Sequence, residues 1–425
     1  MIFPWLGIRR KLVIKFPQLW YLVAYLINCM TTINRNRVQS LDILRGTVMV
    51  IMALDHVRDF LYNPTTNLPP GGPNPTDLAT TFPFLFFTRY ITHFCAPIFI
   101  FLAGTSAFLM SQRRSTKEIS VFLFKRGVWL VAVEVLIVTL GISFNPLYNL
   151  LFLQVIWAIG CSMIILSVLV HLPYRVILAI GLLIVVFHNT LNFVALPKNF
   201  VVDLLYSGLF SIYPYAENRF IVILYAIVPW SGIMLLGYCF GRLYMPDISI
   251  DERKKKLLWM GLGLLGFFVI VRFANFYGDP VKWSVQPRGT VYTFLSFINI
   301  SKYPPSLMYF CVTIGAGLLA LRALESMSNP FTRFMNVFGR VPFFYYIIHF
   351  YLIHGMLAIL FFVRGYPAKD IINPASPILF TPNGLGVSLF GVYIVWAIVI
   401  VIMYPLCKRY NAYKSLHNQW WLSYV

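Results

Sequence analysis

The sequence predicts an all-α protein: a polytopic bundle of about ten transmembrane helices with both termini in the cytoplasm. Composition is the first indication. Of 425 residues, 59% are hydrophobic and only 11% are charged, whereas soluble domains carry about 25% charged residues. The second indication is a series of apolar runs near the length of about 20 residues that a helix needs to cross the bilayer core. The third is the placement of Lys and Arg between these runs.

Ten apolar segments are expected to be spanning helices. They are residues 41–62, 82–110, 120–141, 150–170, 174–193, 220–244, 256–273, 303–324, 340–363 and 385–407. Residues 1–36 form a basic N-terminal segment in which the short apolar run 19–30 predicts an interfacial helix or a re-entrant segment rather than a span. Residues 37–410 then form one transmembrane domain, and residues 411–425 form a cytoplasmic tail.

The distribution of positive charge sets the expected orientation. Expected outside loops 63–81 and 142–149 contain no Lys or Arg, whereas the expected inside loops are basic, as at Arg253–Lys256. This alternation favours cytoplasmic loops at a membrane over nucleic acid as the partner of the net charge of +20. The six cysteines occur singly, so we expect neither a disulfide framework nor a metal site.

The first helix contains charged residues that a lipid-facing helix rarely carries. They are Asp42, Arg45, Asp55, His56, Arg58 and Asp59. Such residues normally face a protein interior or a wet cavity, because a charge at the bilayer centre costs about 2.5–3.5 kcal/mol. Asp55 and Asp59 share a face of the helix, and a histidine beside carboxylates can take a proton near neutral pH. We therefore expect a site at Asp55, His56 and Asp59; an ion-paired packing cluster is the alternative.

Two further helices carry buried polar residues. Arg89 and His93 are four residues apart and are expected at a depth similar to that of His56, and Pro97 opens the helix after them. In the ninth segment, Tyr345 is close enough in sequence to orient the ring of His349. His349 is either a second catalytic or substrate-binding group or a satisfied core histidine. Haem ligation by a histidine pair is a lesser alternative.

Several motifs together resemble a known family. The stretches that carry the resemblance are Arg37–Gly46, Met52–His56, Thr92–Thr105, Tyr277–Pro280, Lys302–Ser306 and Phe338–Pro342. They are similar to the catalytic domain of heparan-alpha-glucosaminide N-acetyltransferase, and most similar to the bacterial integral membrane proteins grouped with it, over about residues 35–410. The resemblance implies a membrane acyltransferase that takes an acetyl or other acyl group from cytosolic acyl-CoA and delivers it to a sugar or glycolipid acceptor beyond the membrane.

The same resemblance implies an inner-membrane location for a bacterial chain, a contribution of Arg45 to holding the phosphates of CoA, and a histidine as base or acyl carrier. One departure concerns that histidine. In the lysosomal enzymes it lies in the loop after the first helix, but loop 63–81 contains none here, and Asp55 stands where those enzymes carry asparagine. His56 is therefore a candidate on chemical grounds.

Acyl transfer is the leading hypothesis. The expected catalytic residues are His56, Asp55 and His93. The expected substrate-binding residues are Arg45, Arg89, Asp59, His349 and Tyr345. A proton-coupled transporter or flippase that uses the same buried Asp and His residues is the alternative. Lipid, acyl-CoA and a carbohydrate are the expected partners, and a homo-oligomer is left open.

Overall fold

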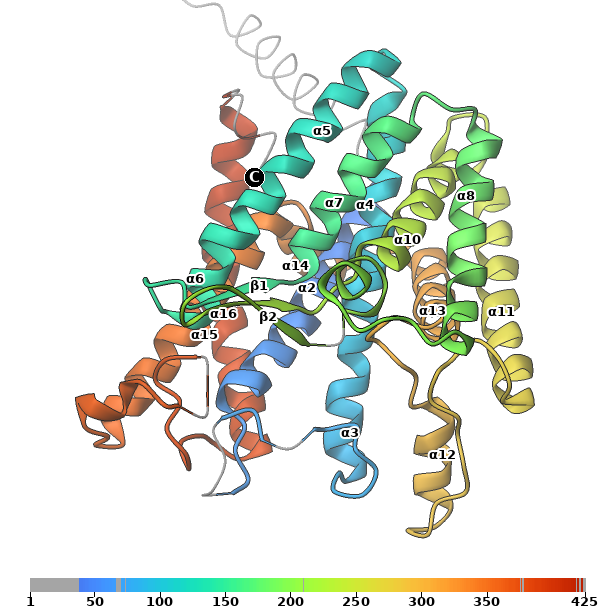
Figure 1. Ribbon diagram of the computed structural model, residues 1–425. Coiled ribbons are helices and arrows are strands. Elements are labelled where there is room, and N and C mark those ends of the chain that lie inside the picture. The colour runs from blue at the N-terminus through green and yellow to red at the C-terminus, as the bar shows by residue number, and fades with distance from the viewer. Residues whose placement is uncertain are drawn as a thin grey trace, which may run out of the picture. The chain divides into compact units, whose positions relative to one another are not determined.

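The computed structural model describes residues 38–65, 70–72, 74–208, 210–374, 376, 378–417, 419 and 422 (Figure 1). The basic segment 1–36 and most of the tail beyond residue 417 lie outside the described residues. Residues Ser40–Val425 form one unit, and most of it is helical. The expectation of a largely helical membrane protein is confirmed.

Each of the ten expected segments contains a helix. These helices are α2 (Gln39–Leu61), α3 (Pro83–Tyr90) with α4 (Cys95–Ser111), α5 (Thr116–Val133) with α6 (Thr139–Ser143), α7 (Val155–Leu169), α8 (Tyr174–Phe187), α10 (Ile227–Phe240), α11 (Ile250–Ala274), α13 (Leu307–Leu324), α15 (Pro342–Val363) and α16 (Leu389–Leu416). Shorter helices lie between them: α9 (Phe200–Val202), α12 (Thr290–Ile298) and α14 (Pro330–Gly339). The helix α12 lies within the region expected to be an outside loop.

Six helical stretches of the described chain are long and apolar enough to cross a membrane. They are Pro83–Ser111, Tyr174–Phe193, Ile250–Ala274, Leu307–Leu324, Pro342–Val363 and Leu389–Leu416. The helix α2 has the length of a span, at 23 residues, but is not among the six because it carries so many charges. The total of ten spans and the cytoplasmic placement of the termini stay predictions.

Local sequence explains where many helices begin. Ser115 and Glu118 form a capping box at the start of α5, and the Ser306 side chain accepts from the Tyr309 N–H at the start of α13. A proline in the first turn opens α3, α14 and α15, where its missing N–H costs no hydrogen bond. These caps satisfy backbone donors that would otherwise be orphaned at the helix ends.

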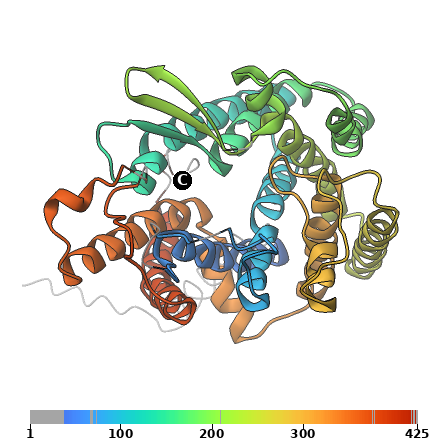
Figure 2. The ribbon, with the colours of Figure 1, turned by 60° about the horizontal axis from the view of Figure 1, so that its bottom comes forward.

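A small three-stranded sheet interrupts the helical pattern. Its strands are β1 (Leu150–Leu153), β2 (Ser211–Ala216) and β3 (Arg219–Ile223), in the order β1-β3-β2, with β1 parallel and β2 antiparallel to β3. Figure 2 shows the strands along one edge of the described unit. The all-α expectation is wrong here because residues 150–153 and 220–223, each at the start of an expected apolar helix, pair with each other as strands. Short apolar runs do not distinguish a buried strand from a helix.

Close helix contacts depend on glycine. A Cβ at Gly46 of α2 would lie 1.8 Å from the Met335 carbonyl oxygen of α14. A Cβ at Gly104 of α4 would lie 2.1 Å from the Met234 carbonyl oxygen of α10. Backbones this close leave no room for a side chain.

The helix α2 lies between the α3–α4 stretch and the C-terminal helices α15 and α16 in both views (Figures 1 and 2). Two hydrogen bonds join α16 to the neighbouring helices α2 and α3. The Trp396 indole N–H donates to the Val50 carbonyl of α2 at 2.8 Å, and the Tyr393 hydroxyl lies 2.8 Å from Thr88 Oγ1 of α3. These contacts hold together the helices that carry the expected site residues.

Candidate functional site

A network of charged side chains joins α2 to α3. Asp55 accepts from Arg58 Nη2 through Oδ1, at 2.8 Å, and from Arg89 Nη1 through Oδ2. Arg58 Nη2 also donates to Asp59 Oδ1 at 2.6 Å. The Asp55 and Arg58 side chains are 10% and 3% exposed, whereas that of Asp59 is 50% exposed. Charges buried in this way persist only when they are paired, and here each carboxylate has a guanidinium partner.

A pair of histidines lies beside this network. His56 Nδ1 is 2.6 Å from Nε2 of His349, which comes from α15. The His349 Nδ1 lies 3.0 Å from the Tyr345 carbonyl oxygen, one helical turn earlier. A carbonyl can only accept, so His349 Nδ1 carries a proton and the neutral His349 ring accepts at Nε2. The His56 Nδ1–H must then be the donor between the rings.

That hydrogen-bond order determines the reactive atom of His56. With its proton on Nδ1, neutral His56 has its free lone pair on Nε2. The ring is partly exposed, and it is fixed by stacking on His349 and Phe350, with centroid distances of 4.9 and 4.3 Å. His56 therefore presents a fixed, accessible proton acceptor.

Tyr345 holds His349 in two ways. Its carbonyl accepts the His349 proton, and its ring stacks on the imidazole with centroids 5.4 Å apart and planes inclined by 20°. Within the described part of the chain, the buried Tyr345 and Tyr346 hydroxyls have no hydrogen-bond partner. Tyr345 thus contacts the histidine pair with its ring and backbone rather than with its hydroxyl.

His93 is set by a local break in its helix. Residues Ile91–Phe94 form a 3-10 turn between α3 and α4. Pro97 has no N–H to give to the His93 carbonyl, and the Tyr309 hydroxyl donates to that carbonyl instead, at 2.7 Å. The His93 Nδ1 donates to the Arg89 carbonyl at 3.0 Å, which leaves Nε2 as the accepting atom. His93 packs against Tyr309 and makes no direct contact with the histidine pair among the described side chains.

Arg45 lies apart from these groups. It is ten residues before Asp55 on α2, about 15 Å along the axis at 1.5 Å per residue. Arg45 Nη1 donates to Asp42 Oδ1 at 2.7 Å, and Nη2 donates to Ser106 Oγ at 3.0 Å. The structure therefore brings together Asp55, His56, Asp59, Arg89, His349 and Tyr345, with His93 one turn beyond Arg89. It does not bring Arg45 to them.

Sequence reasoning missed two cations of the site. Arg58 bridges both carboxylates, whereas in the sequence it is one of several charges on the first helix. Lys302, in the segment before α13, has its ammonium 5.8 and 5.1 Å from the ring centroids of Tyr225 and Tyr303. Tyr225 in turn packs on Trp230, with ring centroids 5.0 Å apart, and Trp230 packs on Tyr309 beside His93. In the sequence, Lys302 stands within the motif Lys302–Ser306 that carries the family resemblance. It also looks like an ordinary lysine at the membrane interface, so the sequence alone does not single it out.

A buried carboxylate holds the segment that carries Lys302. Asp279 accepts from the Ser301 N–H at 2.9 Å and from Ser306 Oγ at 2.7 Å, and it lies 3.8 Å from Arg272. Burial raises the pKa of the Asp279 carboxyl, although the Ser306 hydroxyl and the Arg272 charge oppose that shift.

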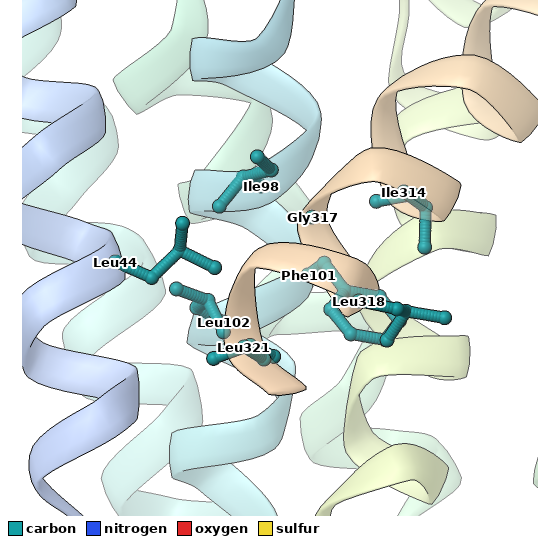
Figure 3. Close-up of a pocket in the computed structure, with 8 residues that line it drawn as sticks. All are labelled: Leu44, Ile98, Phe101, Leu102, Ile314, Gly317, Leu318 and Leu321. Carbon is teal, nitrogen blue, oxygen red and sulfur yellow. The ribbon is translucent and has the colours of Figure 1, made fainter. Parts of the chain in front are cut away.

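The apolar pocket in Figure 3 is separate from these polar groups. It lies among α2, α4 and α13, and its lining is entirely apolar: Leu44, Ile98, Phe101, Leu102, Ile314, Gly317, Leu318 and Leu321. It has no side chain that could bind a proton or a charge. The described residues contain no group of three His, Cys, Asp or Glu side chains arranged to hold a metal.

A helical membrane bundle with a fixed proton acceptor beside a buried charged network belongs to the class of membrane-embedded enzymes and transporters. The family model for the catalytic region of heparan-alpha-glucosaminide N-acetyltransferase matches residues 37–273. This is more than half of the chain, which therefore belongs to that family and is an acyltransferase-type integral membrane protein. No curated protein matches the chain. His56, Arg89 and His93 lie inside the matched region, whereas Lys302 and His349 follow it.

Proposed function

We propose that this protein transfers an acetyl group from cytosolic acetyl-CoA to an amine or hydroxyl of a sugar or glycolipid on the far side of the membrane. The observation that supports this most strongly is the 2.6 Å contact between His56 Nδ1 and His349 Nε2, because it leaves His56 Nε2 free to accept a proton. General bases of this kind contribute about 10²–10⁴-fold to rate.

In the proposed reaction the acceptor amine or hydroxyl attacks the thioester carbonyl carbon while His56 Nε2 takes its proton. The new C–N or C–O bond forms, the C–S bond breaks, and the leaving thiolate takes the proton back from the His56 imidazolium. The products are the acetylated acceptor and the free CoA thiol, and His56 returns to its neutral form. The neighbouring Asp55 carboxylate stabilises the transient imidazolium.

The other site residues position these groups. Arg58 and Arg89 hold Asp55 in place, and His349 holds the His56 ring through its Nε2. His93 and the half-exposed Asp59 are proposed to contact the acceptor, because both lie next to the charged network yet neither is needed to hold His56.

The donor is proposed to enter from the opposite end of α2. Arg45 lies near that end, and the exposed Lys255 and Lys256 in the first turns of α11 add positive charge on the expected cytoplasmic side. Cations there suit the phosphates of CoA. The pantetheine arm would then have to reach along α2 towards His56. An inner-membrane location for a bacterial source is part of the same proposal.

Calorimetric titration of the purified full-length protein with acetyl-CoA tests the donor. Saturable binding is expected, and it should weaken in Arg45→Ala. Ser106→Ala is the matched control, because it removes one hydrogen bond of Arg45 but keeps the charge. A well-folded protein that binds no acyl-CoA would contradict the proposal and favour proton-coupled transport through Asp55 and His56.

A further inference from the structure

The charges beside His56 do not balance. Arg58, Arg89 and Lys302 contribute three positive charges, and Asp55 and Asp59 contribute two negative ones. Both Asp55 oxygens are occupied, Oδ1 by Arg58 and Oδ2 by Arg89, and Asp59 pairs with Arg58. Among the described side chains, Lys302 is the cation of this group that no carboxylate contacts.

Lys302 is held where its charge is uncompensated. Its side chain is half-buried, and among the described residues its ammonium contacts only the faces of Tyr225 and Tyr303. Those two rings pack edge-on with centroids 5.6 Å apart, and Phe210 packs on Tyr303 at 5.3 Å. Aromatic faces stabilise an ammonium by about 0.5–2 kcal/mol, but they do not neutralise its charge. An anionic ligand would neutralise it.

The backbone around Lys302 is fixed as well. Lys302 and Pro305 form an antiparallel bridge, and Asp279 binds both Ser301 and Ser306 on either side. A long lysine side chain loses much rotamer freedom when it is ordered, and this turn and the two tyrosines already restrict it. Lys302 is therefore preorganised, and ligand binding would cost little further side-chain entropy.

The position of Lys302 indicates which substrate it meets. It precedes α13 on the expected outer side of the membrane, whereas Arg45 and the basic loops lie towards the expected cytoplasmic side. Its neighbour Tyr225 packs on Trp230, which packs on Tyr309, and Tyr309 contacts His93. A ligand group at Lys302 would thus lie on the acceptor side of the proton-accepting atom rather than with the donor phosphates.

We propose that Lys302, between Tyr225 and Tyr303, binds an anionic group of the acceptor and so selects acceptors with a phosphate, sulfate or carboxylate near the nucleophilic amine or hydroxyl. This inference rests on the proposed acetyl transfer. Lys302 is assigned as a specificity-determining residue.

The test compares D-glucosamine with D-glucosamine 6-phosphate and D-glucosamine 6-sulfate as acceptors for full-length protein in detergent. Release of CoA thiol and calorimetric binding of each sugar are both measured. The charged sugars should have a KM and a Kd lower than those of glucosamine by about tenfold or more, as expected for a charged hydrogen bond. In Lys302→Met the charged and neutral sugars should have equal KM and equal Kd values, in a protein that still binds acetyl-CoA, and Lys302→Arg should restore part of the preference.

Lys282→Met is the matched control, because Lys282 is an exposed lysine of the preceding loop. It should keep the preference for charged sugars. Thiol release without such a preference, or an equal preference in Lys302→Met, would overturn this inference and leave acetyl transfer intact. Absence of acetyl-CoA binding would overturn acetyl transfer itself. Even then, binding of glucosamine 6-sulfate that is lost in Lys302→Met would support Lys302 as the site of the anionic group. A charged sugar that does not bind at all would overturn the assignment of Lys302.

Discussion

His56 Nδ1 lies 2.6 Å from His349 Nε2, although the two residues are 293 positions apart in the chain. The contact joins the first helix of the described unit to α15, and the Tyr345 carbonyl completes the series at 3.0 Å. Because each hydrogen bond fixes the proton of the next ring, the backbone carbonyl of Tyr345 determines which nitrogen of His56 is free.

Replacing His349 should slow the chemical step without weakening donor binding. His349→Phe keeps a ring in place but removes the acceptor for His56 Nδ1–H, so we expect kcat to fall by about 10²-fold, as for a misplaced general base. His349→Gln, whose amide oxygen can accept, should lose less. The measurement is the rate of CoA thiol release together with the Kd for acetyl-CoA. The control variant is His171→Phe, because His171 is exposed. A wild-type rate in His349→Phe would contradict the role of His349 in orienting His56.

Asp55 should matter far more for stability than Asp59. Asp55→Asn leaves the Arg58 and Arg89 guanidinium groups buried without their shared carboxylate, and breaking a buried pair costs about 3–5 kcal/mol. Asp59→Asn removes a half-exposed partner, which is worth about 1 kcal/mol or less. Melting temperatures in one detergent at one scan rate compare the two. Equal losses for both variants would show that Asp55 is not the centre of the network.

The contact between α2 and α14 should not tolerate a methyl group. Gly46→Ala places a Cβ 1.8 Å from the Met335 carbonyl oxygen, so the helices must separate. We expect a loss of about 1–3 kcal/mol or more, as for overpacking, and a lower melting temperature. In the control Gly263→Ala on α11, a Cβ meets nothing within 4 Å, so stability should be unchanged or slightly higher. A harmless Gly46→Ala would contradict the close approach of these helices.

Asp279 should give the protein a measurable pH dependence. Burial raises the pKa of this carboxyl above its ordinary value of about 3.9, so the folded protein holds the proton more tightly than the unfolded chain does. Its contribution to stability is therefore full below the ordinary pKa and falls as the pH rises through the raised one. The melting temperature of the wild type, minus that of Asp279→Asn, should be larger near pH 4 than near pH 7. A difference that grows with pH would reverse the assigned shift.

Most helices of the bundle can be predicted from the sequence because each consists of a long apolar run. The ten segments, the close approach at Gly104 and the opening of the helix at Pro97 all result from local chemistry. The sheet does not, since Leu150–Leu153 and Arg219–Ile223 are too short to reveal their period and pair across a long separation in the chain.

The site was predictable in part for the same reason. Asp55, Arg89 and His349 are conspicuous because each is polar within an apolar helix. That His56 pairs with His349, and that Lys302 lies over Tyr225 and Tyr303, depends on how segments far apart in the chain meet, which no local pattern encodes. Arg45 was also conspicuous, but its partners Asp42 and Ser106 place it elsewhere.

The most direct test of acetyl transfer is the release of free CoA thiol from acetyl-CoA by the purified protein, with and without an amino sugar, for wild type and His56→Ala. We expect acceptor-dependent thiol release by the wild type and its loss, by about 10²–10⁴-fold, in a His56→Ala protein that still melts at the wild-type temperature and binds acetyl-CoA. Equal thiol release by both proteins would remove His56 from the reaction. No release by a folded wild type with any amino sugar would contradict acetyl transfer to such acceptors.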